Sequence, residues 1–456
     1  MKAKLRGGSV QLDGFRQVVD ELYLSFNRVP HEPGSDCRRH PEHTGWLLSA
    51  LGHPDHAYPV VMVTGSKGKG SYAYYLSEIL RAHGYSVGLF SSPGLLSDRE
   101  RIRINGRLIP EAALVATWRA IRPHWQTLLQ RLPSGQYVGP VGLFAVIAAQ
   151  YFRDHHVDWA VIETGRGARF DDVAQIFHPH AVITNILPEH LRELGPTTDE
   201  VAWHKLGIVH PETQNLFLGS SSPALTRVMV AQRPTWPRHL ITHDLEQAVS
   251  IHDRRGDRTG TRFSVRLASG LALSHLWMPA VGPVIDNFGG ALAVADRLIR
   301  LSPCVVADLT ASLSWPGRGE IVSTQPYLVL DASIQGESAK QLVSALGGRF
   351  DHAVLSLPNS KDRSGVRSVL EAVTPSIIYT TCSNPYLRYD YGDSRWRAHD
   401  RLVEAVSQAL DLSSRTASPD ARILWMGTIS FIADCYRYLN RSAIPNQPLD
   451  APQVPG

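Results

Sequence analysis

Cysteine is scarce in this chain of 456 residues, and long apolar runs are missing. Four cysteines occur singly, with no CxxC pair, which argues against a disulfide framework or a zinc knuckle. No stretch approaches the 18 apolar residues of a membrane-spanning helix, and no apolar run follows the basic amino terminus. We therefore expect a cytoplasmic protein in a reducing compartment.

An excess of charge of one sign is also missing. The 46 basic and 42 acidic residues leave a net charge of +4, which argues against nucleic acid or a membrane surface as the partner. Small molecules are the expected partners. Lysine is rare among the basic residues, so each lysine within a motif is conspicuous. The lysines are Lys2, Lys4, Lys67, Lys69, Lys205, Lys340 and Lys361.

Apolar runs that alternate with helical patterns predict an α/β protein with a largely parallel sheet. In the first part these runs are 59–64, 85–92, 158–163 and 181–186. We place a P-loop-containing, parallel-sheet ATPase domain at 1–310, with peripheral antiparallel strands at about 245–280.

A second α/β series predicts a smaller, Rossmann-like domain at 311–456. Its expected strands are 327–332, 352–357, 376–381 and 422–427. A proline-rich end to the chain is typical of a loose tail. The length agrees with two or three domains.

A glycine-rich loop between the first strand and its helix is suited to binding the phosphates of ATP. Its residues are Gly65, Gly68, Lys69, Gly70 and Ser71. Glycines let backbone amides approach phosphates, Lys69 adds a cation, and the Ser71 hydroxyl is a ligand for Mg²⁺. The strict G-x4-G-K-[ST] pattern is not met, because Val63 replaces its first glycine and Gly70 follows Lys69. A glycine-rich connector without a ligand is the alternative.

Two further polar residues follow strands of the first series. Glu163 ends the apolar run 158–163, at the sheet edge where α/β proteins bind ligands, and its carboxylate suits Mg²⁺. His190 lies four residues after the run 181–186. Taken singly, Glu163 is equally typical of a solvated strand end, and His190 is more typical of a surface histidine or a satisfied histidine in the core.

The order of the motifs resembles that of the Mur ligase superfamily, and within it the folylpolyglutamate and dihydrofolate synthase branch. The resemblance covers about residues 45 to 430. The motifs are VTGSKGKGS at 63–71, SSPGLLSDRERIRING at 91–106, ETGRGARFDD at 163–172, ITNILPEHLRELG at 183–195, DEVAWHKLGIV at 199–209, WPGRGE at 315–320, LDASIQGESA at 330–339 and SKDRSG at 360–365.

This resemblance implies an ATP-dependent amide ligase that forms an acyl phosphate and uses two Mg²⁺ ions. By position, Lys69 matches the phosphate-binding lysine, and Ser71, Glu163 and His190 match magnesium-binding groups. Lys205 matches a lysine that the family carbamylates to bind the second ion. A lysine on a helix surface is the alternative for Lys205.

The resemblance also assigns residues to the nucleotide and to the substrate. Asn287 matches a residue near the nucleotide, Arg318 one directed toward the phosphates, and Asp331 one that engages the ribose. The expected substrate residues are Ser92, Arg169, Lys361 and Asp362.

Several positions depart from the family pattern on the substrate and adenine sides, where polar residues are expected. These positions are Gly94, the pair Phe144–Ala145, Ala174, the pair Val284–Ile285 and the pair Ile334–Gln335. Lys67 stands where folate enzymes usually have asparagine, and it resembles the basic loop residue of poly-γ-glutamate synthases. We therefore predict a divergent acceptor, in a specialised biosynthetic pathway.

Two alternatives stay open. One is a genuine folylpolyglutamate or dihydrofolate synthase that adds glutamate to a folate. The other is a nucleotide-binding pseudoenzyme, although the retained lysines and metal-binding residues argue against it. The resemblance favours a monomer.

Overall fold

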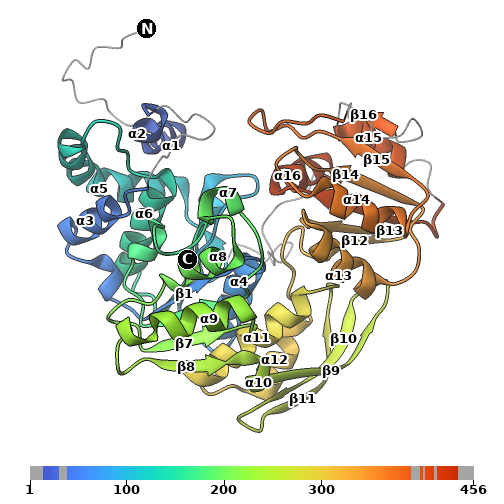
Figure 1. Ribbon diagram of the computed structural model, residues 1–456, viewed down its shortest axis with the longest axis horizontal. Coiled ribbons are helices and arrows are strands. Elements are labelled where there is room, and N and C mark those ends of the chain that lie inside the picture. Colours follow the sequence, from blue (N-terminus) through green and yellow to red (C-terminus); the bar gives the residue numbers. More distant parts are fainter. Residues whose placement is uncertain (1–13, 30–38, 392–400, 404–405, 415–417, 440–456) are drawn as a thin grey trace, which may run out of the picture.

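The computed structural model describes residues 14–29, 39–391, 401–403, 406–414 and 418–439. Figure 1 shows two α/β parts side by side, with a small antiparallel sheet below them. The tail predicted at the end of the chain lies outside the described residues. In the part of the chain that is described, no helix is both long enough and apolar enough to cross a membrane.

An eight-stranded sheet forms the centre of the first part, in the order β4-β3-β2-β5-β1-β6-β7-β8. The pairs β2–β3 and β3–β4 are antiparallel, and the other pairs are parallel. The strands are β1 (Val60–Thr64), β2 (Val87–Phe90), β3 (Ile102–Ile104), β4 (Arg107–Leu108), β5 (Trp159–Glu163), β6 (His180–Ile183), β7 (Asn215–Leu218) and β8 (Ile241–Asp244).

Helices cover both faces of this sheet, because its central strands are apolar on both sides. Val60 and Met62 of β1 belong to one core with α3, α5 and α6, whereas Val61 and Val63 belong to the other core with α4 and α11. The helices are α1 (Phe15–Leu22), α2 (Leu24–Asn27), α3 (Glu42–Ala50), α4 (Lys69–Ala82), α5 (Glu111–Arg131), α6 (Pro140–Asp154), α7 (Leu191–Leu194), α8 (Thr198–Leu206), α9 (Pro223–Gln232), α10 (Leu245–Ala248), α11 (Val284–Leu298) and α12 (Pro303–Thr310), with 3₁₀ turns η1 (Pro54–His56), η2 (Asp98–Arg101), η3 (Val173–Gln175) and η4 (Arg233–Thr235).

Three antiparallel strands lie within the range where the sequence predicts such strands. They are β9 (Val249–Gly256), β10 (Thr261–Leu267) and β11 (Ala272–Met278), with β10 in the centre. Arg258, in the turn between β9 and β10, donates to the carbonyl of Asp420 over 2.9 Å. This turn therefore contacts the second α/β part.

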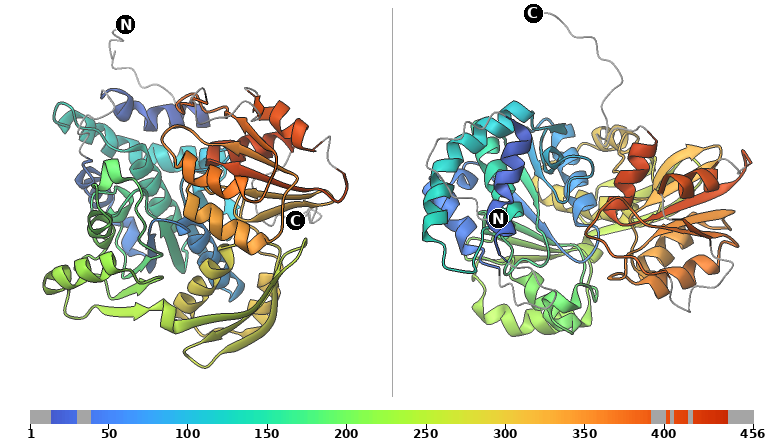
Figure 2. Two further views of the ribbon diagram at one scale, coloured as in Figure 1. Left: turned by 45° about the vertical axis from the view of Figure 1, so that its right-hand side comes forward. Right: turned by 90° about the horizontal axis from the view of Figure 1, so that it is seen from above.

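The second part contains a six-stranded sheet in the order β12-β13-β17-β14-β15-β16, parallel except for β12. Its elements are β12 (Glu320–Thr324), β13 (Tyr327–Asp331), α13 (Gly336–Leu346), β14 (His352–Ser356), α14 (Arg363–Glu371), β15 (Ile377–Thr380), β16 (Arg401–Val403), α15 (Val406–Ser414), β17 (Arg422–Gly427) and α16 (Ile429–Tyr438). Helices α13 and α14 pack on one face, and α15 and α16 on the other (Figure 2). The predicted α/β fold class is confirmed; the domain division at 310, where α12 ends, stays a prediction.

Candidate functional site

The glycine loop joins the carboxyl end of β1 to the start of α4. Gly65 and Gly68 have φ values of 142° and 79°. A Cβ atom at Gly65 would lie 1.9 Å from Thr184 Oγ1, and one at Gly68 would lie 2.5 Å from Asn287 Oδ1. Both positions therefore need glycine, and the loop lies directly against the side chain of Asn287.

Lys69 begins α4, so the loop combines a cation with the free amides of a helix amino terminus. Its Nζ donates to the carbonyl oxygen of Gly65 over 2.9 Å and lies across the loop. Such an arrangement can bind phosphate groups, as the sequence predicts.

A buried hydroxyl and a buried carboxylate lie beside this loop. Ser71 is 1% exposed, and its Oγ finds no hydrogen-bond partner among the described residues. Glu163 is buried at the end of β5, where its Oε2 accepts the amide of Ser92 over 3.1 Å. A Cβ at Gly70 would lie 3.2 Å from the same Oε2, which places the carboxylate against the first turn of α4. An unpartnered hydroxyl oxygen near a buried carboxylate fits a hard divalent cation such as Mg²⁺.

Burial and the neighbouring charges act in opposite directions on the ionisation of Glu163. Burial raises the pKa of Glu163, and the positive charge of Lys69, the amide of Ser92 and Arg318 oppose that rise. Arg318 comes from the second α/β part, and it lines a pocket between the two parts. That pocket is lined by Gly70, Ser92 and Glu163 from the first part and by Trp315, Arg318 and Ile429 from the second.

Three of the seven lysines meet beside the loop. Lys205, in α8, is 1% exposed, and its Nζ donates to Gly65 O over 2.8 Å and to Glu189 Oε1 over 3.2 Å. The Nζ of Lys67 lies 3.4 Å from Glu189 Oε2. Burial and the neighbouring charge of Lys69 lower the pKa of Lys205 to about 8. We call Lys67, Lys69, Lys205 and Glu189 the lysine cluster.

Glu189 is the member of the lysine cluster that sequence reasoning did not single out. Burial acts to raise its pKa, but Lys69, Lys205 and Lys67 together hold it below its ordinary value. Three cations around one carboxylate leave a surplus of positive charge beside the loop, which suits a transferring phosphate. The sequence feature that could have identified Glu189 is its position directly before His190 in the motif 183–195.

His190 follows Glu189 and precedes α7 with a left-handed backbone, φ 51°. Burial lowers its pKa to about 4, and the positive charge of Lys361 contributes to the decrease. The imidazole is therefore neutral near pH 7 and keeps a lone pair for a cation. The structure brings His190 next to the lysine cluster.

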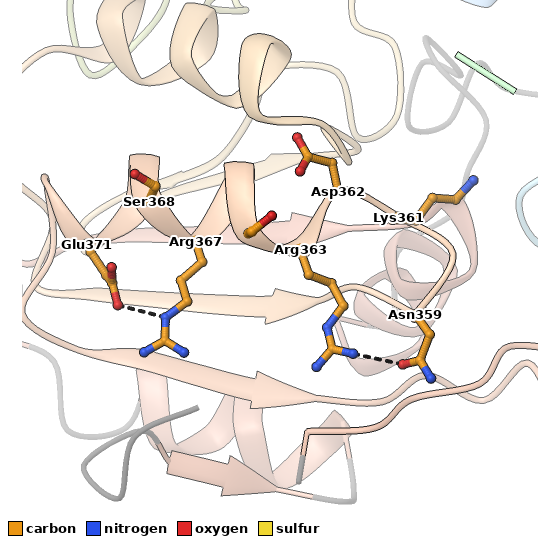
Figure 3. A pocket seen from close by; sticks show the side chains of 8 residues that line it. Asn359, Lys361, Asp362, Arg363, Arg367, Ser368 and Glu371 are labelled. Atoms are coloured by element: carbon orange, nitrogen blue, oxygen red, sulfur yellow. Dashed lines mark hydrogen bonds and ion pairs between the residues drawn. The ribbon is translucent and has the colours of Figure 1, made fainter. Parts of the chain in front are cut away.

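Lys361 and Asp362 stand where the chain enters α14 (Figure 3). Asp362 is tied to the backbone, because Oδ1 accepts the amide of Gly365 over 3.0 Å and Oδ2 that of Gly336 over 2.8 Å. Lys361 lines one end of a polar pocket that runs along α14. Burial lowers the pKa of Lys67, and the charge of Lys361 contributes to the decrease, so this end of the second part faces the lysine cluster.

Asp331 supports the loop that carries Arg318. Asp331 Oδ2 accepts the amide of Gly319 over 2.6 Å, and Oδ1 accepts the amide of Ser333 over 2.7 Å. Burial lowers the pKa of Arg318, while the charges of Asp331 and Glu163 act to raise it. Asp331 therefore orients Arg318 toward the pocket between the two parts.

Arg169 is the predicted substrate residue that the structure directs to other partners. Its guanidinium lies 4.0 Å from the ring centroid of Trp203, and its Nη2 donates to Gln232 over 2.9 Å. These contacts connect the loop after β5 to α8 and to the end of α9.

The fold and the site together define a two-part, nucleotide-dependent ligase of the Mur ligase type. No family model matches the chain. It is 32% identical over 317 residues to folylpolyglutamate synthase of Lacticaseibacillus casei, which covers 68% of this chain and 72% of the relative. It is 28% identical over 407 residues to dihydrofolate synthase/folylpolyglutamate synthase of Mycobacterium tuberculosis, with 82% and 83% covered.

A longer relative is the probable bifunctional folylpolyglutamate synthase/dihydropteroate synthase of Haloferax volcanii, 27% identical over 461 residues. That match covers 94% of this chain, and this chain spans about half, 51%, of the relative. Among solved structures, Mycobacterium tuberculosis folylpolyglutamate synthase complexed with ADP and AMPPCP has a TM-score of 0.80 at 25% identity, covering 93% of this chain and 99% of the other.

The chain belongs to the folylpolyglutamate synthase family. The predicted resemblance is therefore confirmed, as is the class of enzyme, an ATP-dependent ligase that forms amide bonds. The solved relative from Mycobacterium tuberculosis binds ADP and AMPPCP, and another, from Yersinia pestis, is complexed with AMPPNP and a Mn ion. In this chain the buried oxygens of Ser71 and Glu163 fit a divalent cation.

Proposed function

We propose that this enzyme joins glutamate to a folate at the expense of ATP. A carboxylate of the folate attacks the γ-phosphorus and releases ADP, which gives an acyl phosphate. The glutamate amine then attacks the acyl carbon and loses a proton, and the tetrahedral intermediate expels phosphate. The observation that carries this proposal is the similarity along both α/β parts to relatives named for these activities.

The environment of the departures supports the folate proposal over the divergent acceptor. Ala145 and Ala174 are buried in one core of the first sheet, and Val284 and Ile285 are buried in the other. Apolar side chains at these four positions are needed for packing, and a polar group there would have to find a buried partner. These four departures are therefore compatible with an unchanged acceptor.

The replacement of the family's histidine by glycine at position 94 has a separate physical reason. A Cβ at this position would lie 2.2 Å from the carbonyl oxygen of Ser97. The loop after β2 thus adopts a path that excludes any side chain at residue 94. A tighter loop accounts for the lost histidine without a new substrate.

One set of residues holds the phosphates of ATP, and another set binds the metal ion. The loop amides and Lys69 hold the phosphates of ATP, and Arg318 approaches them from the second part. Ser71, Glu163 and His190 bind Mg²⁺, which neutralises phosphate charge when bound. Their support is the unpartnered Ser71 Oγ, the buried carboxylate of Glu163 with Lys69 and Arg318 nearby, and the neutral His190.

We further propose that Lys205 is carbamylated. A pKa of about 8 leaves part of the Nζ neutral near pH 7, and a neutral amine adds to CO₂ with loss of one proton. The product is a carboxylate, suited to a second Mg²⁺ beside the loop. Its alternative, a lysine on a helix surface, does not agree with a side chain that is 1% exposed.

The divergent acceptor is the second candidate, and Lys67 favours it. Its ion pair with Glu189 puts a cation where the resemblance leads one to expect asparagine. This cation adds to the positive charge beside the loop and would attract an acceptor more acidic than folate.

Phosphate release from Mg-ATP distinguishes the candidates. Dihydropteroate or tetrahydrofolate with glutamate is tested beside a panel of other acids and amino acids, and the products are identified by mass. Folate-dependent turnover with a mass gain of one or more glutamates supports the first proposal. Turnover only with another pair supports the divergent acceptor, and binding of ATP without turnover for any pair supports the pseudoenzyme. Lys69→Ala, which lacks the phosphate-binding cation, is the inactive control.

A further inference from the structure

A group of metal-binding side chains lies at the end of β1 remote from the glycine loop. His53, Asp55 and His56 belong to the turn η1, which precedes the first residue of β1, Val60. The loop begins after Thr64. Five strand residues separate the two ends by about 16 Å at 3.3 Å per residue. This group is therefore distinct from the proposed Mg²⁺ site.

The three side chains converge. Each offers one potential ligand atom, and these atoms lie within 4.8 Å of one another. His53 Nδ1 is 3.8 Å from Asp55 Oδ1, and the rings of His53 and His56 have centroids 4.7 Å apart. Bonds of about 2.0–2.1 Å at tetrahedral angles put ligand atoms roughly 3.3 Å apart. Because both histidines are exposed, small rotations about their side-chain bonds close the difference.

Asp55 has a buried carboxylate oxygen that accepts no hydrogen bond from the described residues. It is 1% exposed, yet within the described part of the chain its Oδ1 has no hydrogen-bond partner. The other oxygen, Oδ2, accepts the amide of Phe177 over 2.7 Å. A buried carboxylate oxygen that accepts no hydrogen bond and lies near two imidazoles is costly unless something binds it.

Neighbouring groups orient these potential ligands, as the hydrogen-bonding partners of metal ligands do. The amide of Phe177 fixes the carboxylate of Asp55, and the ring of Phe177 packs 4.5 Å from that of His56. Nearby His178 is not available as a further ligand, because both of its ring nitrogens lie within hydrogen-bond distance of carbonyl oxygens, at 2.6 and 2.7 Å. The exposed side leaves a coordination position to water.

A second histidine–carboxylate group has no buried carboxylate like that of Asp55. His40 Nδ1 pairs with Glu42 Oε1 at 2.8 Å, and His43 Nε2 pairs with Gln136 at 2.8 Å. Glu42 is exposed, so its carboxylate is hydrated and needs no ion. That group therefore gives no sign of a bound ion.

We propose that His53, Asp55 and His56 bind one Zn²⁺ ion at the amino end of β1. Two imidazole nitrogens and one carboxylate oxygen are a donor set that Zn²⁺ prefers and that Mg²⁺, which prefers oxygen ligands, does not. The ion would connect η1, through Asp55, to the segment of Phe177 ahead of β6. It would thus fix the start of the strand that carries the glycine loop.

The test is zinc binding by the full chain without a histidine tag. Protein freed of metal is dialysed against buffered Zn²⁺ with excess Mg²⁺, so that Mg²⁺ occupies the oxygen-rich sites. Bound zinc per chain is then measured by elemental mass spectrometry. We compare wild type with His53→Ala and His56→Ala. Both replaced side chains are exposed, so both variants should fold. His239→Ala, at an exposed histidine outside the group, is the matched control.

We expect one equivalent of zinc in wild type and in His239→Ala. In His53→Ala and His56→Ala the affinity should fall by about 100-fold or more, since even an outer partner of a ligand contributes 10- to 100-fold. Asp55→Asn keeps an acceptor for the Phe177 amide but removes the charge, and it should also lose the equivalent. Equal zinc binding in all variants would overturn the proposal. So would the absence of bound zinc in wild type at about 0.1 mM Zn²⁺, a concentration far above the dissociation constant of a preformed zinc site.

Discussion

Lys69 and Lys205 donate to the same acceptor, the carbonyl oxygen of Gly65, over 2.9 and 2.8 Å. Two ammonium groups on one oxygen repel each other, and the charge of Lys69 is one cause of the lowered pKa of Lys205. The glycine loop and α8 are thus electrostatically coupled. The carboxylate of Glu189, which accepts a hydrogen bond from Lys205 Nζ, offsets part of this repulsion.

Lys205→Ala tests the proposed carbamate. We expect turnover to fall at least about 100-fold, because a ligand for the second Mg²⁺ is lost where charge develops. Acetate or another short carboxylate should then restore part of the activity by occupying the vacated space. The measurement is phosphate release with and without the added carboxylate.

Lys340→Ala is the matched control for that variant, since Lys340 is exposed on α13. Its turnover should equal that of wild type and should not respond to acetate. If acetate fails to raise the activity of Lys205→Ala at any concentration, the carbamate is wrong and Lys205 acts as a cation.

Ser71→Ala separates metal binding from stability. The Oγ of Ser71 is buried and makes no hydrogen bond to any described residue, so its removal should leave the free energy of unfolding within about 0.5 kcal/mol of wild type. The Mg²⁺ concentration needed for half-maximal turnover should rise at least about 10-fold. Urea unfolding and a Mg²⁺ titration measure the two effects.

Ser77→Ala, on the same helix, should behave in the opposite way. Ser77 Oγ donates to the carbonyl of Tyr74 over 2.7 Å, so its loss should cost about 1 kcal/mol of stability and leave the Mg²⁺ requirement unchanged. An unchanged Mg²⁺ requirement in Ser71→Ala would remove Ser71 from the metal site.

Glu189→Gln tests the counter-charge of the lysine cluster. It removes the carboxylate that pairs with Lys67 and Lys205 and leaves buried positive charge uncompensated. We expect the free energy of unfolding to fall by about 3 kcal/mol. Glu193→Gln, whose carboxylate pairs with Arg166 at the surface, should change it by less than about 0.5 kcal/mol. Equal effects in urea unfolding would contradict a role for Glu189 as the buried counter-charge.

In protein freed of CO₂, where Lys205 carries no carbamate, its pKa predicts how stability changes with pH. The folded-state value of about 8 lies below the ordinary 10.5, so between these pH values the unfolded chain binds more protons. Stability should therefore rise with pH in this window, by about 3 kcal/mol for 2.5 pKa units. Lys205→Met lacks the titrating group, and the difference between wild type and variant isolates the effect.

Denaturant unfolding at pH 8, 9 and 10 provides the measurement for both proteins. The tyrosines and the other lysines titrate in both and cancel in the difference. A difference that stays constant with pH would mean that Lys205 keeps its proton in the folded state as readily as in the unfolded one.

Much of the fold was predictable because its strands are local patterns. The run 59–64 is apolar on both faces, and it forms β1 in the centre of the sheet. Strands β7 and β12 are as long as β2 and β1 but were not predicted, because their sequences NLFL and EIVST contain too few consecutive apolar residues to form a recognisable run. The departures at Ala145 and Val284 were interpreted as pocket changes because burial cannot be read at a single position; both lie in the core.

The sequence by itself determined the strand, glycine loop and helix around Lys69 and the strand-end position of Glu163, because adjacent residues encode each of them. Only the tertiary structure decided that Lys67, Lys205 and Glu189 meet at this loop. Strand β1 lies between β5 and β6, so the carboxyl ends of all three parallel strands reach one edge. The order of strands in a sheet depends on long-range packing, which no local pattern contains.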